Sequence, residues 1–118
     1  MAAQLLAGKS AIVTGGVTGI GRAIALGFLR QGAAVTVNHL DDAASHRHFE
    51  SLRSEAPEQS RLQGVTGDIG ARSVGGAIID TAVNKYGAVD VFVANAGVSQ
   101  FKDFLTYVHD RFRENSEC

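Results

Sequence analysis

The chain has 118 residues, a formal net charge of −1 and one cysteine, Cys118, at its last position. This length suits at most one domain, the small net charge argues against a nucleic-acid partner, and a lone cysteine excludes an internal disulfide. No apolar stretch is long enough to span a membrane, and residues 1–8 lack a signal-peptide pattern. We therefore expect a cytoplasmic protein without a membrane partner.

Strand and helix patterns alternate along the chain. In chain order the sequence predicts a strand at 11–14, a helix that opens at Ile20 and is stopped by Gln31-Gly32, a strand at 33–37, a helix from Asp41-Asp42 to about Glu55, a strand at 62–66, a helix at 71–86 and a strand at 89–94. Ile20, Ile24 and Phe28 form the apolar stripe of the first helix. Gly87 closes the third helix. The last strand is apolar except for Asp90, as expected of a strand buried on both faces of a sheet.

The loop between the first strand and the first helix is rich in glycine. Gly15, Gly19 and Gly21 follow Thr14 with the spacing Gly-x-x-x-Gly-x-Gly. A strand that ends in glycines and leads straight into a helix leaves backbone N–H groups free at the positive end of the helix dipole. A pyrophosphate can bind there, so this loop predicts a dinucleotide site. The alternative is a glycine-rich turn that serves only tight packing.

Right-handed crossovers between these units give the strand order 3-2-1-4 with helices on both faces. The expected fold class is α/β, a Rossmann-like doubly wound parallel sheet that is truncated after its fourth strand. Thr14, Asn38, Asp68 and Asn95 then all lie at or just beyond carboxyl ends of strands. Each is also an ordinary polar loop residue when taken alone.

The glycine spacing, Asp68 after the third strand and Asn95-Ala96-Gly97 after the fourth resemble the short-chain dehydrogenase/reductase family. The resemblance implies that Gly15, Gly19, Ile20 and Gly21 surround the pyrophosphate. It also implies that Asp68, with Ile69 beside it, binds the adenine amino group and that Asn95-Ala96-Gly97 line the adenine ribose. The full predicted cofactor set is Thr14, Gly15, Val17, Thr18, Gly19, Ile20, Gly21, Asn38, His39, Asp68, Ile69, Asn95, Ala96 and Gly97.

The choice between NAD and NADP depends on the end of the second strand, which reads Asn38-His39-Leu40. NAD-preferring members usually have an acidic residue there, so its absence slightly favours NADP, and a protonated His39 could bind a 2′-phosphate. However, Val17-Thr18 lacks the basic residue of many NADP-specific members, and Asp41-Asp42 follow closely. Dual specificity therefore stays open.

A closer similarity concerns the substrate. Residues 15–25, 37–40, 95–98 and 101–105 look like those of sugar 1-dehydrogenases that act on L-rhamnose and oxidise its anomeric carbon to a lactone. The resemblance implies an alcohol or sugar substrate for a full-length form, which would also be a homo-oligomer.

The family's catalytic residues, a serine and a Tyr-x-x-x-Lys pair, are not found in the chain. Tyr86 lies in the wrong half, and Tyr107 is followed four residues later by Arg111 instead of lysine. We therefore expect residues 1–118 to be a partial NAD(P)-binding domain without dehydrogenase activity of its own. The alternative is a non-catalytic nucleotide-binding or interaction module. His46 and His48 are too close in sequence to share a helix face, so no metal site is expected.

Overall fold

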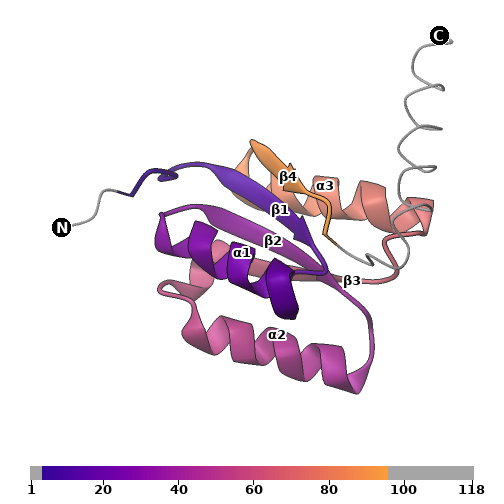
Figure 1. Ribbon diagram of the computed structural model, residues 1–118. Coiled ribbons are helices and arrows are strands. Elements are labelled where there is room, and N and C mark those ends of the chain that lie inside the picture. The colour runs from indigo at the N-terminus through magenta and orange to yellow at the C-terminus, as the bar shows by residue number, and fades with distance from the viewer. Residues whose placement is uncertain (1–3, 96–118) are drawn as a thin grey trace, which may run out of the picture.

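A four-stranded parallel sheet with helices on both faces organises the chain (Figure 1). The computed structural model describes residues 4–95, and within them the strand order is β3-β2-β1-β4, as the sequence predicted. The strands are β1 (Ser10–Thr14), β2 (Ala34–His39), β3 (Leu62–Thr66) and β4 (Val91–Val93). The helices are α1 (Gly19–Arg30), α2 (Ala43–Glu55) and α3 (Arg72–Tyr86), with a short 3-10 turn at Gln59–Arg61. Within this part of the chain, no helix has the length and apolar character needed to cross a membrane.

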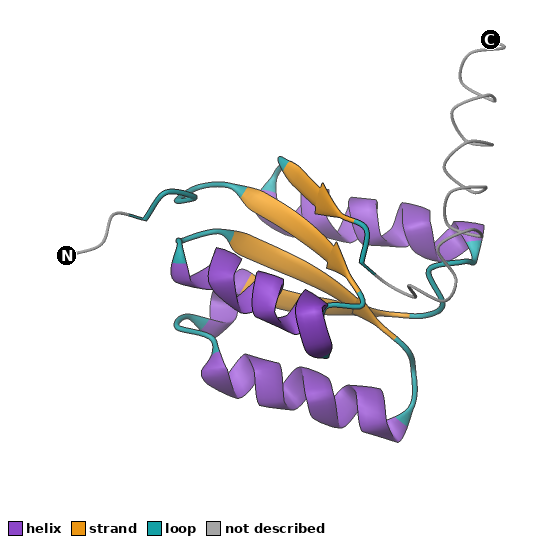
Figure 2. Ribbon diagram, viewed as in Figure 1, coloured by secondary structure: helices purple, strands orange, loops and turns teal. Residues whose placement is uncertain are grey.

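Helices cover both faces of the sheet (Figure 2). Each face carries its own apolar core. Val13, Val35 and Val37 face α1 and α2 and form the larger core with their buried side chains. On the other face, Ile12 packs against Ile78 and Ala82 of α3. Successive residues of a strand point to opposite faces, so neighbouring residues of β1 take part in different cores.

A polar bridge accompanies the smaller core. Gln63 of β3 lies opposite Thr36 of β2 in the parallel register. The Gln63 side-chain amide donates to the Thr36 hydroxyl at 2.9 Å and to the Thr81 carbonyl at 3.2 Å. One side chain therefore ties β2, β3 and α3 together.

The buried face of α1 differs by one position from the predicted stripe. Gly21, Ala25, Leu26 and Leu29 are buried, whereas Ile20 is 73% exposed. Ile24 and Phe28 are only partly buried beside the core. The sheet meets the helix along the row that starts at Gly21, because the missing side chain there permits the closest approach.

Two strands also differ in length from the prediction. β2 continues to His39, two residues past the expected end, because Asn38 and His39 keep pairing with Val65 and Thr66 of β3. β4 is shorter than expected, and its Phe92 is 43% exposed, so burial on both faces was wrong for this strand. Within the described sheet β4 pairs only with β1, and α3 packs over β1, β2 and β3.

Two capping residues lie where the sequence predicted them, one before α2 and one after α3. Of the two aspartates before α2, Asp42 is the N-cap: its carboxylate accepts from the Ser45 N–H at 2.7 Å, and this bond lowers the pKa of the carboxyl. Gly87 follows α3 with φ of 87°, a left-handed conformation that favours glycine. Its N–H donates to the Val83 carbonyl at 2.8 Å.

We expect Gly87→Ala to lower the free energy of unfolding by about 1 kcal/mol, because an alanine Cβ is strained at positive φ. No atom lies near that Cβ, so the cost is one of backbone conformation alone. Gly76→Ala, in the interior of the same helix with equally open space, should raise the stability by about 0.5–1 kcal/mol. Urea unfolding followed by circular dichroism measures both changes. Equal effects of the two substitutions would contradict this account of the cap.

Candidate functional site

The carboxyl ends of the four parallel strands meet at one edge of the sheet (Figure 1). Most of the predicted site residues lie at or just beyond these strand ends. Contacts link them directly. The Gly16 N–H donates to the Asn38 carbonyl at 3.3 Å, and the Gly67 N–H donates to the His39 carbonyl at 2.9 Å. The edge is thus a continuous surface built from the loops that follow β1, β2 and β3.

The chain adopts the left-handed conformation twice between β1 and α1, at Gly15 in the loop (φ 63°) and at Gly19, the first residue of α1 (φ 55°). Thr18 is the N-cap of α1, but its side chain accepts no hydrogen bond from the helix, and the first turn has no acidic residue. The first N–H groups of a helix have no partner inside the helix. The amino end of α1 therefore offers backbone donors and a positive dipole end to an anion.

Gly21 is where this loop, the helix and the residue after β4 come together. A Cβ at this position would lie 2.4 Å from both the Gly15 carbonyl oxygen and the Asn95 Nδ2 atom. The Asn95 side chain donates to the Gly15 carbonyl at 3.2 Å, and its backbone N–H donates to the Thr14 hydroxyl at 3.0 Å. That hydroxyl in turn donates to the Val93 carbonyl at 3.4 Å. Thr14 and Asn95 thereby join the ends of β1 and β4.

This loop also requires a glycine at position 16, a residue that was not among the predicted site residues. A Cβ there would lie 2.6 Å from Cγ1 of Val37. Together with the buried Val17, it seats the loop on the larger core. A second glycine beside the motif was the available signal, but only the fold shows that β2 lies against it.

The predicted loop residues differ in what they present to solvent. Thr18, Gly19 and Ile20 are exposed, whereas the side chains of Thr14 and Val17 are buried. A ligand at this edge would therefore meet backbone and the Ile20 side chain first.

Asn38 and His39 turn inward from the end of β2. The Asn38 amide donates to the carbonyls of Gly67 at 2.9 Å and Val65 at 3.3 Å. His39 is 6% exposed, and its ring stacks on Phe49 with centroids 5.3 Å apart. Its Nδ1–H donates to the Leu40 carbonyl at 2.9 Å. Both side chains thus connect β2 to β3 and α2.

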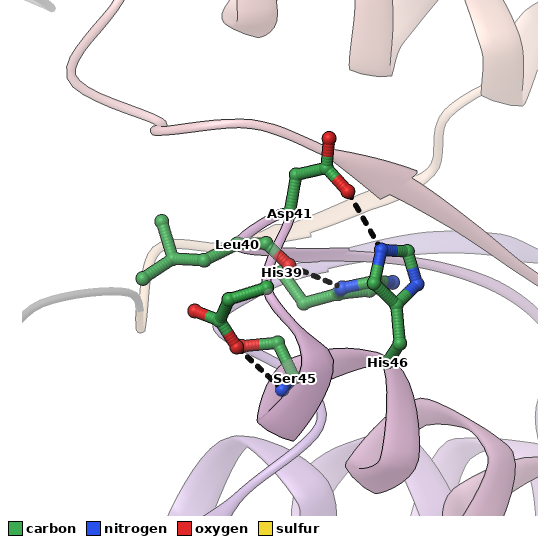
Figure 3. Close-up of polar contacts among 6 residues, drawn as sticks. His39, Leu40, Asp41, Ser45 and His46 are labelled. Carbon is green, nitrogen blue, oxygen red and sulfur yellow. Dashed lines mark hydrogen bonds and ion pairs between the residues drawn. The ribbon is translucent and has the colours of Figure 1, made fainter.

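The surface beyond His39 is formed by Asp41 and His46 (Figure 3). The His46 ring is exposed and contacts Asp41: its Nε2 atom lies 2.7 Å from Asp41 Oδ1. It also meets the His39 ring edge-on, with centroids 5.2 Å apart. No group of three or more His, Cys, Asp or Glu residues in the range 4–95 could hold a metal ion.

Asp68 and Ile69 form the turn after β3. The exposed Asp68 carboxylate accepts from the Gly70 N–H at 2.9 Å, and the Asp68 carbonyl accepts from the Ala71 N–H at 2.9 Å. Ile69 is buried in the smaller core. Ala96 and Gly97, also predicted for the site, lie outside the described residues.

Comparison with known proteins gives consistent matches. The family model described as short chain dehydrogenase matches residues 9–117. L-rhamnose-1-dehydrogenase of Scheffersomyces stipitis is 44% identical over 102 residues, which cover 86% of this chain and 40% of that protein. L-rhamnose 1-dehydrogenase (NAD(P)(+)) of a Sphingomonas species is 41% identical over 103 residues, covering 86% and 39%.

A solved structure agrees with these matches. Glucose dehydrogenase of Caenorhabditis elegans in its apo form superposes with a TM-score of 0.71 at 32% identity, covering 80% of this chain and 40% of that one. The chain thus spans about two fifths of the length of the relatives it matches.

Gly21→Ala is expected to lower the free energy of unfolding by about 2–3 kcal/mol, because the new methyl group would clash with a backbone carbonyl that has little room to move. Gly27→Ala is the matched control in the same helix, where a Cβ has no atom within 4 Å. It should raise the stability by about 0.5–1 kcal/mol. Chemical denaturation of both variants measures the difference. A neutral Gly21→Ala would refute the close approach described above.

Proposed function

The chain belongs to the short-chain dehydrogenase family, and we propose that it is the NAD(P)-binding part of an oxidoreductase. The complete enzyme would transfer a hydride between the nicotinamide and an alcohol or carbonyl carbon of its substrate. The observation that carries the proposal is the amino end of α1. Left-handed glycines stand in the loop before it, at Gly15, and at its first residue, Gly19, and the helix has no side-chain cap or acidic first turn.

The cofactor's pyrophosphate would be held by the backbone of the loop from Gly15 to Gly21. The space in front of Gly19 supports this, because a Cβ built there meets no atom within 4 Å. Gly21 and Asn95 would keep the loop against the strand ends, so that its N–H groups stay oriented toward the ligand. When bound, the cofactor would supply the hydride acceptor or donor.

The adenosine end would lie toward the loops after β2 and β3. We propose that the exposed Asp68 carboxylate binds the adenine amino group beside Ile69, and that Asn95, Ala96 and Gly97 line the ribose. The hydrogen bond from the Gly70 N–H would fix the orientation of this carboxylate. Thr14, Val17, Asn38 and His39 would act indirectly here, because their side chains are buried in contacts that shape the site.

Cofactor choice would depend on Asp41 and His46 instead of the His39 ring. A bare carboxylate at Asp41 would repel a 2′-phosphate, and the imidazole that contacts it would reduce this repulsion. We propose that both NADP and NAD bind, with NADP slightly favoured. The name of the Sphingomonas relative, which gives NAD(P)(+), supports use of either cofactor.

A sugar is the proposed substrate of the complete enzyme. The support is the similarity to two L-rhamnose 1-dehydrogenases, which suggests oxidation at an anomeric carbon. The Tyr-x-x-x-Lys pair that the family resemblance implies is absent from this sequence, since neither Tyr86 nor Tyr107 is followed four residues later by lysine. We therefore expect the 118-residue chain to bind cofactor without turnover and the complete form to be a homo-oligomeric enzyme. The alternative is a non-catalytic nucleotide-binding module. Such a module would also bind the cofactor, but its complete form would not catalyse hydride transfer.

Gly19→Asp is expected to weaken NADP and NAD binding about tenfold more than Gly19→Asn, because only aspartate adds a negative charge beside the pyrophosphate. Asparagine and aspartate both tolerate a left-handed conformation, so the two variants share the backbone cost. Isothermal titration of the purified chain gives the dissociation constants. Equal affinities for the two variants, or no binding by the unaltered chain, would argue against this phosphate site.

Asp41→Asn should tighten NADP binding relative to NAD by about three- to tenfold, because it removes the charge that repels the 2′-phosphate. His46→Gln should change the ratio in the opposite direction, since it removes an imidazole that can carry positive charge near Asp41. The ratio of the two dissociation constants, measured for each variant and for the unaltered chain, reports both effects. An unchanged ratio in both variants would remove this pair from cofactor selection.

A further inference from the structure

A cavity lies at the amino ends of the strands, at the sheet edge opposite the candidate nucleotide site. It has a volume of about 270 Å³. Ser10 and Ala34, the first residues of β1 and β2, line it together with Arg61, which directly precedes β3. Tyr86, the last residue of α3, and Lys9 complete the polar lining. Its volume is several times the roughly 30 Å³ that one water occupies in the liquid, so it can hold a small polyatomic ligand.

Ser10 is the residue that the fold leaves unexplained. It is 2% exposed, and its Oγ atom has no hydrogen-bond partner within the described residues. Ser10 lies opposite Ala34 in the sheet and two residues before Ile12, so its side chain points to the face that α3 covers. A buried hydroxyl without a partner is costly, and such groups usually bind a water or a ligand.

Cationic and hydroxyl donors line the same cavity as Ser10. Arg61 donates from Nη1 to the Gly32 carbonyl at 3.1 Å, and its Nε atom lies 2.7 Å from the Glu58 carboxylate. These contacts use two of the five N–H groups of a guanidinium. The Lys9 ammonium has no ion pair among residues 4–95.

Tyr86 adds a third kind of donor. Its hydroxyl donates to the Ser60 carbonyl over a long 3.4 Å. Burial raises the pKa of Tyr86 to about 12, so the hydroxyl keeps its proton at neutral pH. Two carboxylates contact residues of this lining: Glu58 pairs with Arg61, and Asp90 accepts from the Ser10 N–H at 2.9 Å.

We propose that this cavity binds a small oxyanion, a phosphate or a carboxylate group, through the Ser10 hydroxyl, the Arg61 guanidinium and the Lys9 ammonium. The Lys9 ammonium and the remaining guanidinium N–H groups of Arg61 are donors that line the cavity, and the oxygen atoms of an oxyanion are the matching acceptors. The site is separate from the proposed cofactor site, because it is built from the opposite ends of the strands. The proposal of this oxyanion site does not depend on the proposed oxidoreductase function.

The test uses the 118-residue chain labelled with ¹⁵N. Sodium phosphate and sodium acetate are titrated separately at constant ionic strength, while the backbone amide signals are followed by NMR. We expect saturable shifts of the Lys9, Ser10 and Ala34 amides with at least one of the two anions. Saturation by phosphate assigns a phosphate ligand, and saturation by acetate assigns a carboxylate ligand.

Two variants make the test specific. Ser10→Ala should fold normally, because the hydroxyl it removes has no partner, and should weaken anion binding about tenfold. Arg61→Gln should weaken it by a similar factor. Phosphate can also shift the amides of residues 18–21 through the proposed pyrophosphate site. Gly19→Asp should suppress those shifts and leave the response of Lys9, Ser10 and Ala34 unchanged.

The outcomes separate the two proposals. Absence of saturable shifts at Lys9, Ser10 and Ala34 with both anions would overturn the oxyanion site. The same affinity in Ser10→Ala as in the unaltered chain would also overturn it. If phosphate shifts the Lys9, Ser10 and Ala34 amides of the unaltered chain but not those of residues 18–21, the result would instead count against the cofactor proposal.

Discussion

The close approach of backbone to backbone at Gly21 sets the geometry of the whole carboxyl edge. At this point α1 contacts the Gly15 carbonyl without an intervening side chain, and the Asn95 amide reaches the same carbonyl from a position 80 residues along the chain. The contact holds the amino end of α1 against β1. It also fixes the end of β4 beside β1, because Asn95 bonds to Thr14 as well. The helix end, the loop and the outer strand are therefore one unit.

This constraint explains why much of the fold could be predicted from the sequence. Glycines at defined spacing, a Gly87 cap and alternating apolar runs are local signals, and together they gave the correct elements and the strand order 3-2-1-4. Right-handed crossover then leaves little freedom in the arrangement. The family followed from the same local residues.

What the sequence could not predict depends on contacts between distant segments. Ile20 and Gly21 are neighbours, and only the packing against the sheet decides which of them faces the core. Asparagine is a residue type common in exposed loops, but the Asn38 amide donates to carbonyls 27 and 29 residues away. His39 is enclosed by Phe49 and His46 from α2. For the same reason, spacing alone gave no sign of the Asp41–His46 contact as a surface feature, or of the unpartnered Ser10 hydroxyl.

The Gln63 bridge has a consequence for the uniqueness of the fold. The core between the sheet and α3 is small, and apolar contacts alone discriminate poorly between alternative alignments. A shift of β3 by one residue would turn the Gln63 amide away from Thr36 and Thr81, leaving a buried hydroxyl without its donor. Only the misaligned pairings carry this energetic penalty. A single polar side chain thus specifies the strand register, because it favours one arrangement of sheet and helix over other arrangements with similar apolar contacts.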